Sequence, residues 1–142
     1  SHHEDKDTTV LNMMRLAPLV ERNYLAFNEN DLLVDRIAEI LKSKRNVVPI
    51  TTEEGKFKGV IYIETVLAQT MKPNEMSLKL ADLMEEVKPV VISADLKVAL
   101  RKMEQENVWV LPVVNGYGKY IGMLSKTSIF NKYRDILNQQ SY

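Results

Sequence analysis

The chain of 142 residues contains no cysteine. Disulfide bonds, a thiol nucleophile and a thiolate metal site are therefore excluded. Glycine is scarce too, with five residues in all, and none of them belongs to a Walker or dinucleotide phosphate loop. Histidine occurs only at His2 and His3. Two adjacent side chains on a terminal segment do not make a metal site of defined geometry, so we expect no bound metal.

An excess of charge and a long apolar run are also missing. Lysine and arginine number 19, as do aspartate and glutamate, so the formal net charge is zero. A neutral chain lacks the electropositive surface of a nucleic-acid-binding protein, and we expect no nucleic-acid partner. No apolar run reaches the roughly 18 residues of a membrane span. The polar, acidic residues 1–7 are unlike a signal peptide, so the sequence predicts a soluble segment.

What the chain does contain is an internal repeat, and this repeat sets its organisation. A shift of 63 residues superposes identical residues of the two halves: Pro49 on Pro112, Gly55 on Gly118, Lys56 on Lys119 and Gly59 on Gly122. Upstream, a shift of 64 places residues 16–21 on residues 80–85, so a single one-residue insertion reconciles the two registers. Chance matches are scattered, whereas these keep their order. The sequence therefore predicts two copies of one structural unit.

Each half has the same predicted order of elements. An extended run precedes a helix with an apolar face, then come two strands joined by a tight turn, and a second helix closes the half. The expected segments are 24–27, a helix around 33–41, 47–50, 57–63 and a helix from 64, then 89–92, a helix around 96–103, 108–114, 119–125 and a helix from 127. Asn30 and Ser93 are expected to cap the first helix of each half. The order β-α-β-β-α, twice, predicts an α+β fold.

Proline and glycine stand at matching positions inside the predicted strands. Proline cannot donate a ladder hydrogen bond, so Pro49 and Pro112 are expected at a sheet edge or a strand end. Glycine weakens a strand, and the usual reason for its presence is the close approach of another chain segment or of a ligand. We therefore expect something to pass close to Gly59 and to Gly122.

The repeated pattern resembles that of CBS domains, which combine a hydrophobic-Pro-hydrophobic strand with a Gly-hydrophobic-hydrophobic-Thr/Ser strand. The matching segments are Val48-Pro49-Ile50 with Gly59-Val60-Ile61-Tyr62, and Leu111-Pro112-Val113-Val114 with Gly122-Met123-Leu124-Ser125. The resemblance implies a pair of repeats that pack by their sheets with pseudo-two-fold symmetry. It implies this division: a tail or linker at 1–14, repeat 1 at 15–71, a linker at 72–77, repeat 2 at 78–137 and a tail at 138–142.

A narrower resemblance concerns the cytoplasmic tails of bacterial ClC-family chloride channels and chloride/proton exchangers. The segments that carry it are 44–49, 109–114, 118–122, 125–130 and 133–134. It implies a regulatory module on the cytoplasmic face of a membrane, which modulates gating and dimer organisation of a voltage-gated transporter. The implied partners are a second copy of the chain and the transmembrane transport domain of the same full-length protein. Ile129, Phe130 and Tyr133 are the expected apolar surface of the dimer.

The CBS resemblance also implies an adenosine-nucleotide cleft. In the family, a Thr or Ser hydroxyl bonds phosphate, and an Asp three residues later holds the ribose. Here Tyr62 and Ser125 take the hydroxyl position, and Thr65 and Ser128 take the Asp position. A hydroxyl does not match a carboxylate that accepts two charge-assisted bonds, so ATP, ADP or AMP is expected to bind weakly or not at all. The candidate site, in the second half, comprises Val110, Leu111, Pro112, Ser125, Thr127 and Ser128, with Lys126 as a charge for phosphate.

Other interpretations of these residues stay open. The hydroxyls at 125, 127 and 128 are also typical of a helix cap. Trp109 is more typical of an interface anchor than of a stacking platform for adenine. The paired carboxylates at 53–54 and 85–86 predict a solvated face rather than acid–base catalysis, and we expect no enzyme activity. The alternatives to the transporter tail are a nucleotide sensor, attached to a cytosolic enzyme or standing alone, and a dimerisation platform without a ligand.

Overall fold

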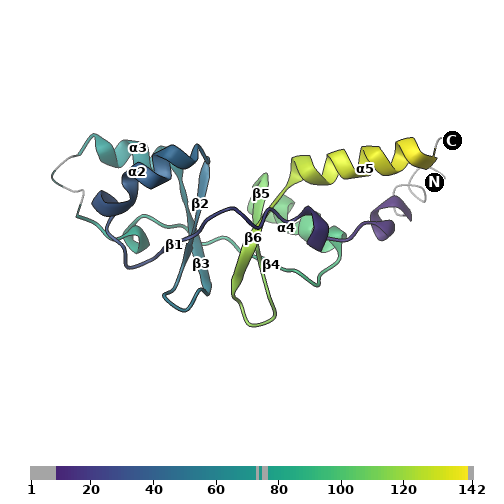
Figure 1. Cartoon of the computed structure of the whole chain (residues 1–142), viewed down its shortest axis with the longest axis horizontal. Coiled ribbons are helices and arrows are strands. Elements are labelled where there is room, and N and C mark those ends of the chain that lie inside the picture. Colours follow the sequence, from purple (N-terminus) through teal and green to yellow (C-terminus); the bar gives the residue numbers. More distant parts are fainter. Residues whose placement is uncertain (1–8, 73, 75–76, 141–142) are drawn as a thin grey trace.

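The computed structural model describes residues 9–72, 74 and 77–140. His2, His3 and part of the expected linker at 72–77 lie outside the described residues. After a helical segment at 9–13, the elements are η1 (Ala17–Leu19), β1 (Phe27–Asn28), α2 (Leu33–Ser43), β2 (Val47–Thr51), β3 (Phe57–Tyr62), α3 (Ile63–Thr70), η3 (Leu80–Asp82), β4 (Val90–Val91), α4 (Leu96–Glu106), β5 (Val110–Val114), β6 (Tyr120–Ser125) and α5 (Lys126–Gln140). The predicted α+β order is confirmed in both halves (Figure 1).

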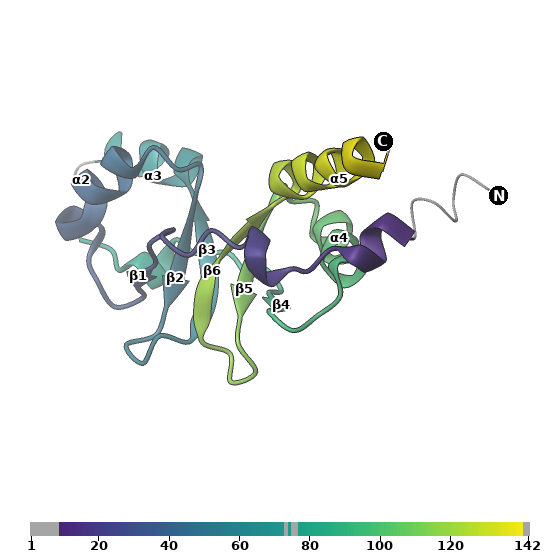
Figure 2. The same ribbon diagram turned by 45° about the vertical axis from the view of Figure 1, so that its right-hand side comes forward.

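Each half forms a three-stranded sheet with the same topology. The strand orders are β1-β2-β3 and β4-β5-β6, with the first pair parallel and the second antiparallel. Even an irregularity of strand pairing is shared by the two halves: the register shifts at Ile50/Thr51 in β2 and at the equivalent Val113/Val114 in β5. The two hairpins lie side by side at the centre, and the helices of each half lie outside them (Figures 1 and 2).

The hairpin turns show the pseudo-two-fold relation directly. The Phe57 N–H donates to the Gly118 carbonyl at 3.0 Å, and the Tyr120 N–H donates to the Gly55 carbonyl at 3.0 Å. These contacts exchange under the 63-residue shift, and Lys56 bridges its own counterpart Lys119. The expected pseudo-two-fold packing of two repeats is therefore confirmed.

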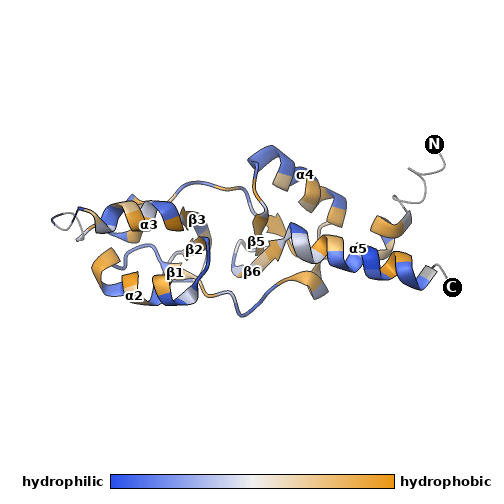
Figure 3. Ribbon diagram, turned by 90° about the horizontal axis from the view of Figure 1, so that it is seen from above, coloured by the Kyte–Doolittle hydropathy of each residue, from blue (hydrophilic) through white to orange (hydrophobic). Residues whose placement is uncertain are grey.

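The first helix of each half begins where its apolar face begins, because burial of that face stabilises it. Leu33 and Ile40 of α2 and Leu96 and Met103 of α4 are buried, and the helices show apolar and polar sides in Figure 3. The predicted caps are wrong: the N-cap positions are Leu32 and Asp95, and neither makes a side-chain capping bond.

The asparagine expected as the first cap takes part in a turn instead. The backbone N–H of Asn30 donates to Oδ1 of Asn28 at 2.8 Å, which closes the turn between β1 and α2. Asparagine favours both helix caps and such turns, because its side chain bonds nearby backbone groups in either. A choice between them needs the position of the helix axis, which the local sequence does not specify.

The strand prolines are accommodated in central strands rather than at an edge. Pro49 lies opposite Val60, and both backbone groups of Val60 bond Glu85 instead of β2. In an antiparallel pair such positions alternate with bonded ones, so the missing N–H of Pro49 faces away from β3. On that side β1 pairs with β2 only from Ile50 onward. Pro112 repeats this arrangement opposite Met123.

The two halves exchange short arms, and the strand glycines make this exchange fit. Glu21, ahead of the first sheet, bridges Met123 of β6, and Glu85, ahead of the second sheet, bridges Val60 of β3. A Cβ atom at Gly59 would lie 2.6 Å from the Glu85 carbonyl oxygen, and one at Gly122 would overlap the Glu21 carbonyl. The expected close approach is confirmed, and the approaching group is backbone from the other half.

The hydrophobic core of the second half includes residues from the N-terminal part of the chain. Val10 and Met14 are buried with Leu111, Leu124 and other residues of the second half, although they precede the first repeat. Ile129 belongs to the same cluster and is 1% exposed. Its expected place on a dimer surface is therefore wrong, because the start of α5 packs inward onto β6. In the described part of the chain, no helix is long and apolar enough to cross a membrane.

Candidate functional site

A cleft opens between the two halves, where the arm that contains Glu21 and precedes the first sheet crosses β6. Its volume is about 310 Å³. The lining residues come from the arm, from the turn before β2, and from the ends of β5 and β6: Glu21, Tyr24, Lys44, Arg45, Asn46, Val47, Val110, Met123, Ser125 and Ser128. Neither repeat alone builds this cleft.

One wall is the junction of β6 and α5. Ser125 ends the strand, and its Oγ accepts a hydrogen bond from the backbone N–H of Ser128 at 3.0 Å. The two hydroxyl oxygens also lie 2.8 Å apart and share a hydrogen bond. This is the geometry of an N-cap, in which a Ser oxygen satisfies a free amide of the first helical turn. Ser125 therefore caps the helix, and both serines line the cleft.

The opposite wall is the turn that joins α2 to β2. Lys44 ends α2 in the left-handed conformation, with a φ of 58°, and so reverses the chain. Ser43 supports the turn, because its Oγ donates to the Ile40 carbonyl at 2.6 Å and accepts from the Arg45 N–H at 3.3 Å. The turn thus places the two basic side chains of Lys44 and Arg45 at the rim of the cleft.

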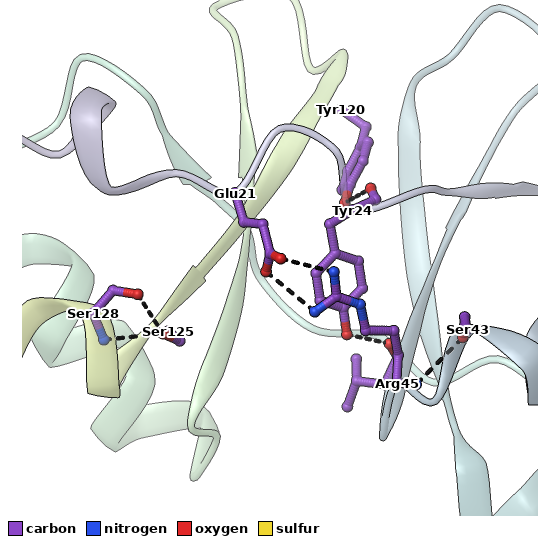
Figure 4. A network of polar contacts seen from close by, with 8 residues as sticks. Glu21, Tyr24, Ser43, Arg45, Tyr120, Ser125 and Ser128 are labelled. Atoms are coloured by element: carbon purple, nitrogen blue, oxygen red, sulfur yellow. Dashed lines mark hydrogen bonds and ion pairs between the residues drawn. The ribbon is translucent and has the colours of Figure 1, made fainter.

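A network of polar contacts holds Arg45 in place (Figure 4). Its guanidinium donates to both carboxylate oxygens of Glu21, at 2.7 and 3.3 Å, and lies 4.2 Å from the centre of the Tyr24 ring. Tyr24 is anchored in turn, because its hydroxyl donates to the Val47 carbonyl at 2.5 Å and its own carbonyl accepts from the Tyr120 hydroxyl at 2.7 Å.

The electrostatics of the network are consistent with this geometry. The hydrogen bond that Arg45 donates to Glu21 raises the pKa of Arg45, so the guanidinium stays charged. Burial raises the pKa of Tyr24 and that of Tyr120, so both hydroxyls stay protonated and act as donors. Two cations, Lys44 and Arg45, line the cleft against one carboxylate. The cleft is therefore suited to an anion.

The predicted site residues separate into two groups. Val110, Ser125 and Ser128 line the cleft. Leu111 and Pro112 are buried in β5, and Thr127 is exposed at the start of α5, so none of these three lines the cleft.

The basic wall of Lys44 and Arg45 was not predicted from the sequence as part of the site. The segment 44–49 was singled out only for its resemblance to a transporter tail. The internal repeat was the sequence signal that could have drawn attention to Lys44 and Arg45. Under the 63-residue shift, the positions before β2 are equivalent to those before β5.

The equivalent positions in the other half carry different chemistry. Asn107 stands where Lys44 does, also left-handed with a φ of 55°, and Val108 stands where Arg45 does. Trp109 is 64% exposed, and the Nζ of Lys126 lies 4.9 Å above its ring, outside the cleft. The basic wall is thus confined to one of the two related positions.

No group of three or more metal-ligating side chains occurs within the described ranges. Among the described residues that line the cleft, the two serine hydroxyls bond each other, the Tyr24 hydroxyl bonds a backbone carbonyl, and the carboxylate bonds an arginine. The cleft thus combines a cationic rim and two serine hydroxyls with apolar side chains of Val47, Val110 and Met123.

Comparisons with known proteins agree with this architecture. Residues 80–135 match the CBS domain family. Among curated proteins, a homoserine O-acetyltransferase of Methanococcus vannielii is 27% identical over 116 residues, which are 80% of this chain and 23% of that protein. This chain therefore spans less than a quarter of that relative's length.

Solved structures resemble the chain over nearly its whole length. CbpB in complex with c-di-AMP has a TM-score of 0.78 and 17% identity, covering 99% of this chain and 98% of that one. The CBS domain of a bacterial CNNM/CorC family Mg²⁺ transporter in complex with ATP has a TM-score of 0.77 and 16% identity, covering 94% and 97%. The chain has the fold of a CBS domain pair.

Proposed function

We propose that this CBS pair is a regulatory module that binds one adenosine nucleotide per chain in the cleft between its repeats, and that it has no catalytic activity of its own. The observation that carries the proposal is the cationic rim of Lys44 and Arg45, which faces the hydroxyls of Ser125 and Ser128 across a single cavity. Two structural neighbours hold adenine nucleotides, c-di-AMP in one and ATP in the other.

The proposed binding is weak, because two features of the site oppose it. Ser128 replaces the ribose-binding carboxylate of the family pattern, and its hydroxyl is shared with Ser125. Two hydrogen bonds to a charged group contribute about 1.5–3 kcal/mol each, so their loss lowers affinity by two orders of magnitude or more. Arg45, the stronger phosphate ligand of the rim, is already paired with Glu21. We expect dissociation constants of roughly millimolar size.

Titration of the isotope-labelled chain with AMP, ADP and ATP, followed by NMR, tests this proposal. Amide shifts are expected at the cleft residues, and the Lys44→Asn variant is expected to weaken ATP more than adenosine. This variant is suitable because Asn107 already holds the equivalent left-handed position, so the backbone tolerates it. Lys132→Asn, on the exposed face of α5, removes the same charge away from the cleft and is the control.

The outcomes distinguish the parts of the proposal. Shifts confined to residues outside the cleft, or no shifts with any nucleotide, contradict the binding site. Micromolar binding contradicts the expected weakness and favours a dedicated energy sensor.

The setting of the module is a second part of the proposal. Attachment to a cytosolic enzyme is supported by the curated relative, whose name is that of an acetyltransferase and of which this chain matches only a part. Attachment to a ClC-type chloride channel or exchanger, at the cytoplasmic face of the membrane, is supported by the resemblance of segments 44–49, 109–114, 118–122, 125–130 and 133–134. The coding sequence on either side decides between them: apolar spans support the transporter, and a catalytic domain supports the enzyme.

Self-association is proposed in either setting. Phe130 is 51% exposed on α5 and is the apolar side chain of the expected surface that solvent reaches best. Two copies that meet through this face would couple their clefts, so that a ligand shifts the assembly by its differential affinity for two arrangements. Sedimentation at increasing concentration is expected to show a dimer, and Phe130→Ser is expected to weaken it. A monomer at every concentration contradicts the proposal.

A further inference from the structure

Glu21 is fixed in the cleft by its backbone rather than by its side chain. Its N–H donates to the Met123 carbonyl at 2.8 Å, and its carbonyl accepts from the Met123 N–H at 3.2 Å. This two-way bridge lies on β6, where Gly122 leaves room for it. The carboxylate is therefore held at the cleft whether or not it has a partner there.

The partner of that carboxylate is the cation that suits a phosphate. Both nitrogens of the Arg45 fork bond the two oxygens of Glu21. Carboxylate and phosphate present the same paired oxygens to a guanidinium, so the two compete for the same face of the arginine. The Tyr24 ring, 4.2 Å from the guanidinium carbon, limits where Arg45 can move. An anion in the cleft must therefore displace Glu21 or share Arg45 with it.

The other half of the repeat shows that the ion pair with an arginine is not required for the bridge. Glu85 makes the same backbone exchange with Val60, at 2.9 and 2.7 Å. Where Arg45 stands in the first half, the second half has the uncharged Val108. The backbone bridge is thus common to both halves, whereas an arginine faces the bridging glutamate in one of them. The ion pair is an addition to the shared architecture rather than part of it.

We propose that Glu21 is an internal competitor for the anionic part of the ligand, and that it lowers the affinity of the cleft for phosphate while leaving nucleoside contacts unchanged. This inference rests on the proposed function, since it assigns the determinant of phosphate affinity within the same cleft. The ion pair is partly exposed, with side-chain exposures of 36% for Arg45 and 44% for Glu21, so its competition is moderate and screened by salt.

The test compares three forms of the chain: the parent, Glu21→Gln and Glu85→Gln. Glutamine keeps the size and the backbone bridge of either glutamate and removes only the charge. Each form is titrated with adenosine, AMP, ATP and inorganic pyrophosphate by NMR at low salt. Glu21→Gln is expected to bind AMP, ATP and pyrophosphate roughly three- to tenfold more tightly, with adenosine unchanged. Glu85→Gln is expected to match the parent for every ligand.

The outcomes separate this inference from the proposed function. If nucleotides bind equally to the parent and to Glu21→Gln, the inference is wrong and the nucleotide site stands. If no nucleoside or nucleotide binds but pyrophosphate binds Glu21→Gln more tightly, the nucleotide function is wrong and the competition stands. If no ligand binds either form, both are wrong. Equal gains in Glu21→Gln and Glu85→Gln also refute the inference, because they indicate a general effect of net charge.

Discussion

Replacement of Gly122 by alanine is expected to destabilise the fold through the exchanged arm. An added Cβ would lie 2.8 Å from the Cγ1 of Val20 and closer still to the carbonyl oxygen of Glu21. If the arm stays in place, the overlap strains a packed region, which typically costs about 1–3 kcal/mol. If the arm moves away, two backbone hydrogen bonds to Met123 are lost, at about 0.5–1.5 kcal/mol each. Either response lowers the free energy of unfolding by about 1–3 kcal/mol.

Urea unfolding followed by far-ultraviolet circular dichroism measures this loss. The matched control is Gly116→Ala, because a Cβ there meets no atom within 4 Å. This variant is expected to stay within about 0.5 kcal/mol of the parent. Gly59→Ala, whose Cβ would lie 2.6 Å from the Glu85 carbonyl, is expected to behave like Gly122→Ala.

A Gly122→Ala variant as stable as Gly116→Ala would refute the reasoning, since it would mean that the arm does not approach β6 as described. A large loss at Gly122 with none at Gly59 would refute the equivalence of the two arms.

Three further predictions concern single features of the fold. Gly118→Ala places a Cβ at a φ of 81° and is expected to cost about 1–2 kcal/mol in urea unfolding without a steric clash. Ser125→Ala removes the cap of α5 and is expected to lower the free energy of unfolding by about 0.5–2 kcal/mol. Thr127→Ala, at an exposed position in the first turn of α5, is expected to leave thermal stability unchanged. Burial raises the pKa of Tyr24 and Tyr120 above the ordinary value of 10.0, so stability is full below that pH and falls as the pH rises above it, by at most about 1.4 kcal/mol per pH unit for each group. Tyr120→Phe is expected to make this alkaline decline shallower in urea titrations at several pH values, and an unchanged decline would contradict the assignment.

The repeat and its element order were predictable from the sequence because their causes are local. Apolar periodicity and turn glycines each follow from the conformation of a few neighbouring residues. The strand glycines predicted a close approach, but the approaching segment comes from the other half and was not predictable. The repeat strengthened each prediction, because the same pattern occurs twice, as with Gly59 and Gly122. The helix caps were missed because Asn30 satisfies a turn as well as it would satisfy a helix.

The candidate site depended on contacts that no local pattern contains. Ser125 and Ser128 were predicted from the resemblance to the CBS family pattern. The ion pair instead joins Glu21 to Arg45, 24 residues later, beside Met123 of the other half. The crossing of the two arms also decided that Val10 and Met14 pack in the second core and that Ile129 is buried. Composition and periodicity cannot predict this packing, because it depends on which face of which sheet each segment covers. The sequence by itself determined two equal units; tertiary structure decided how the units exchange segments, and so where a cationic cleft forms between them.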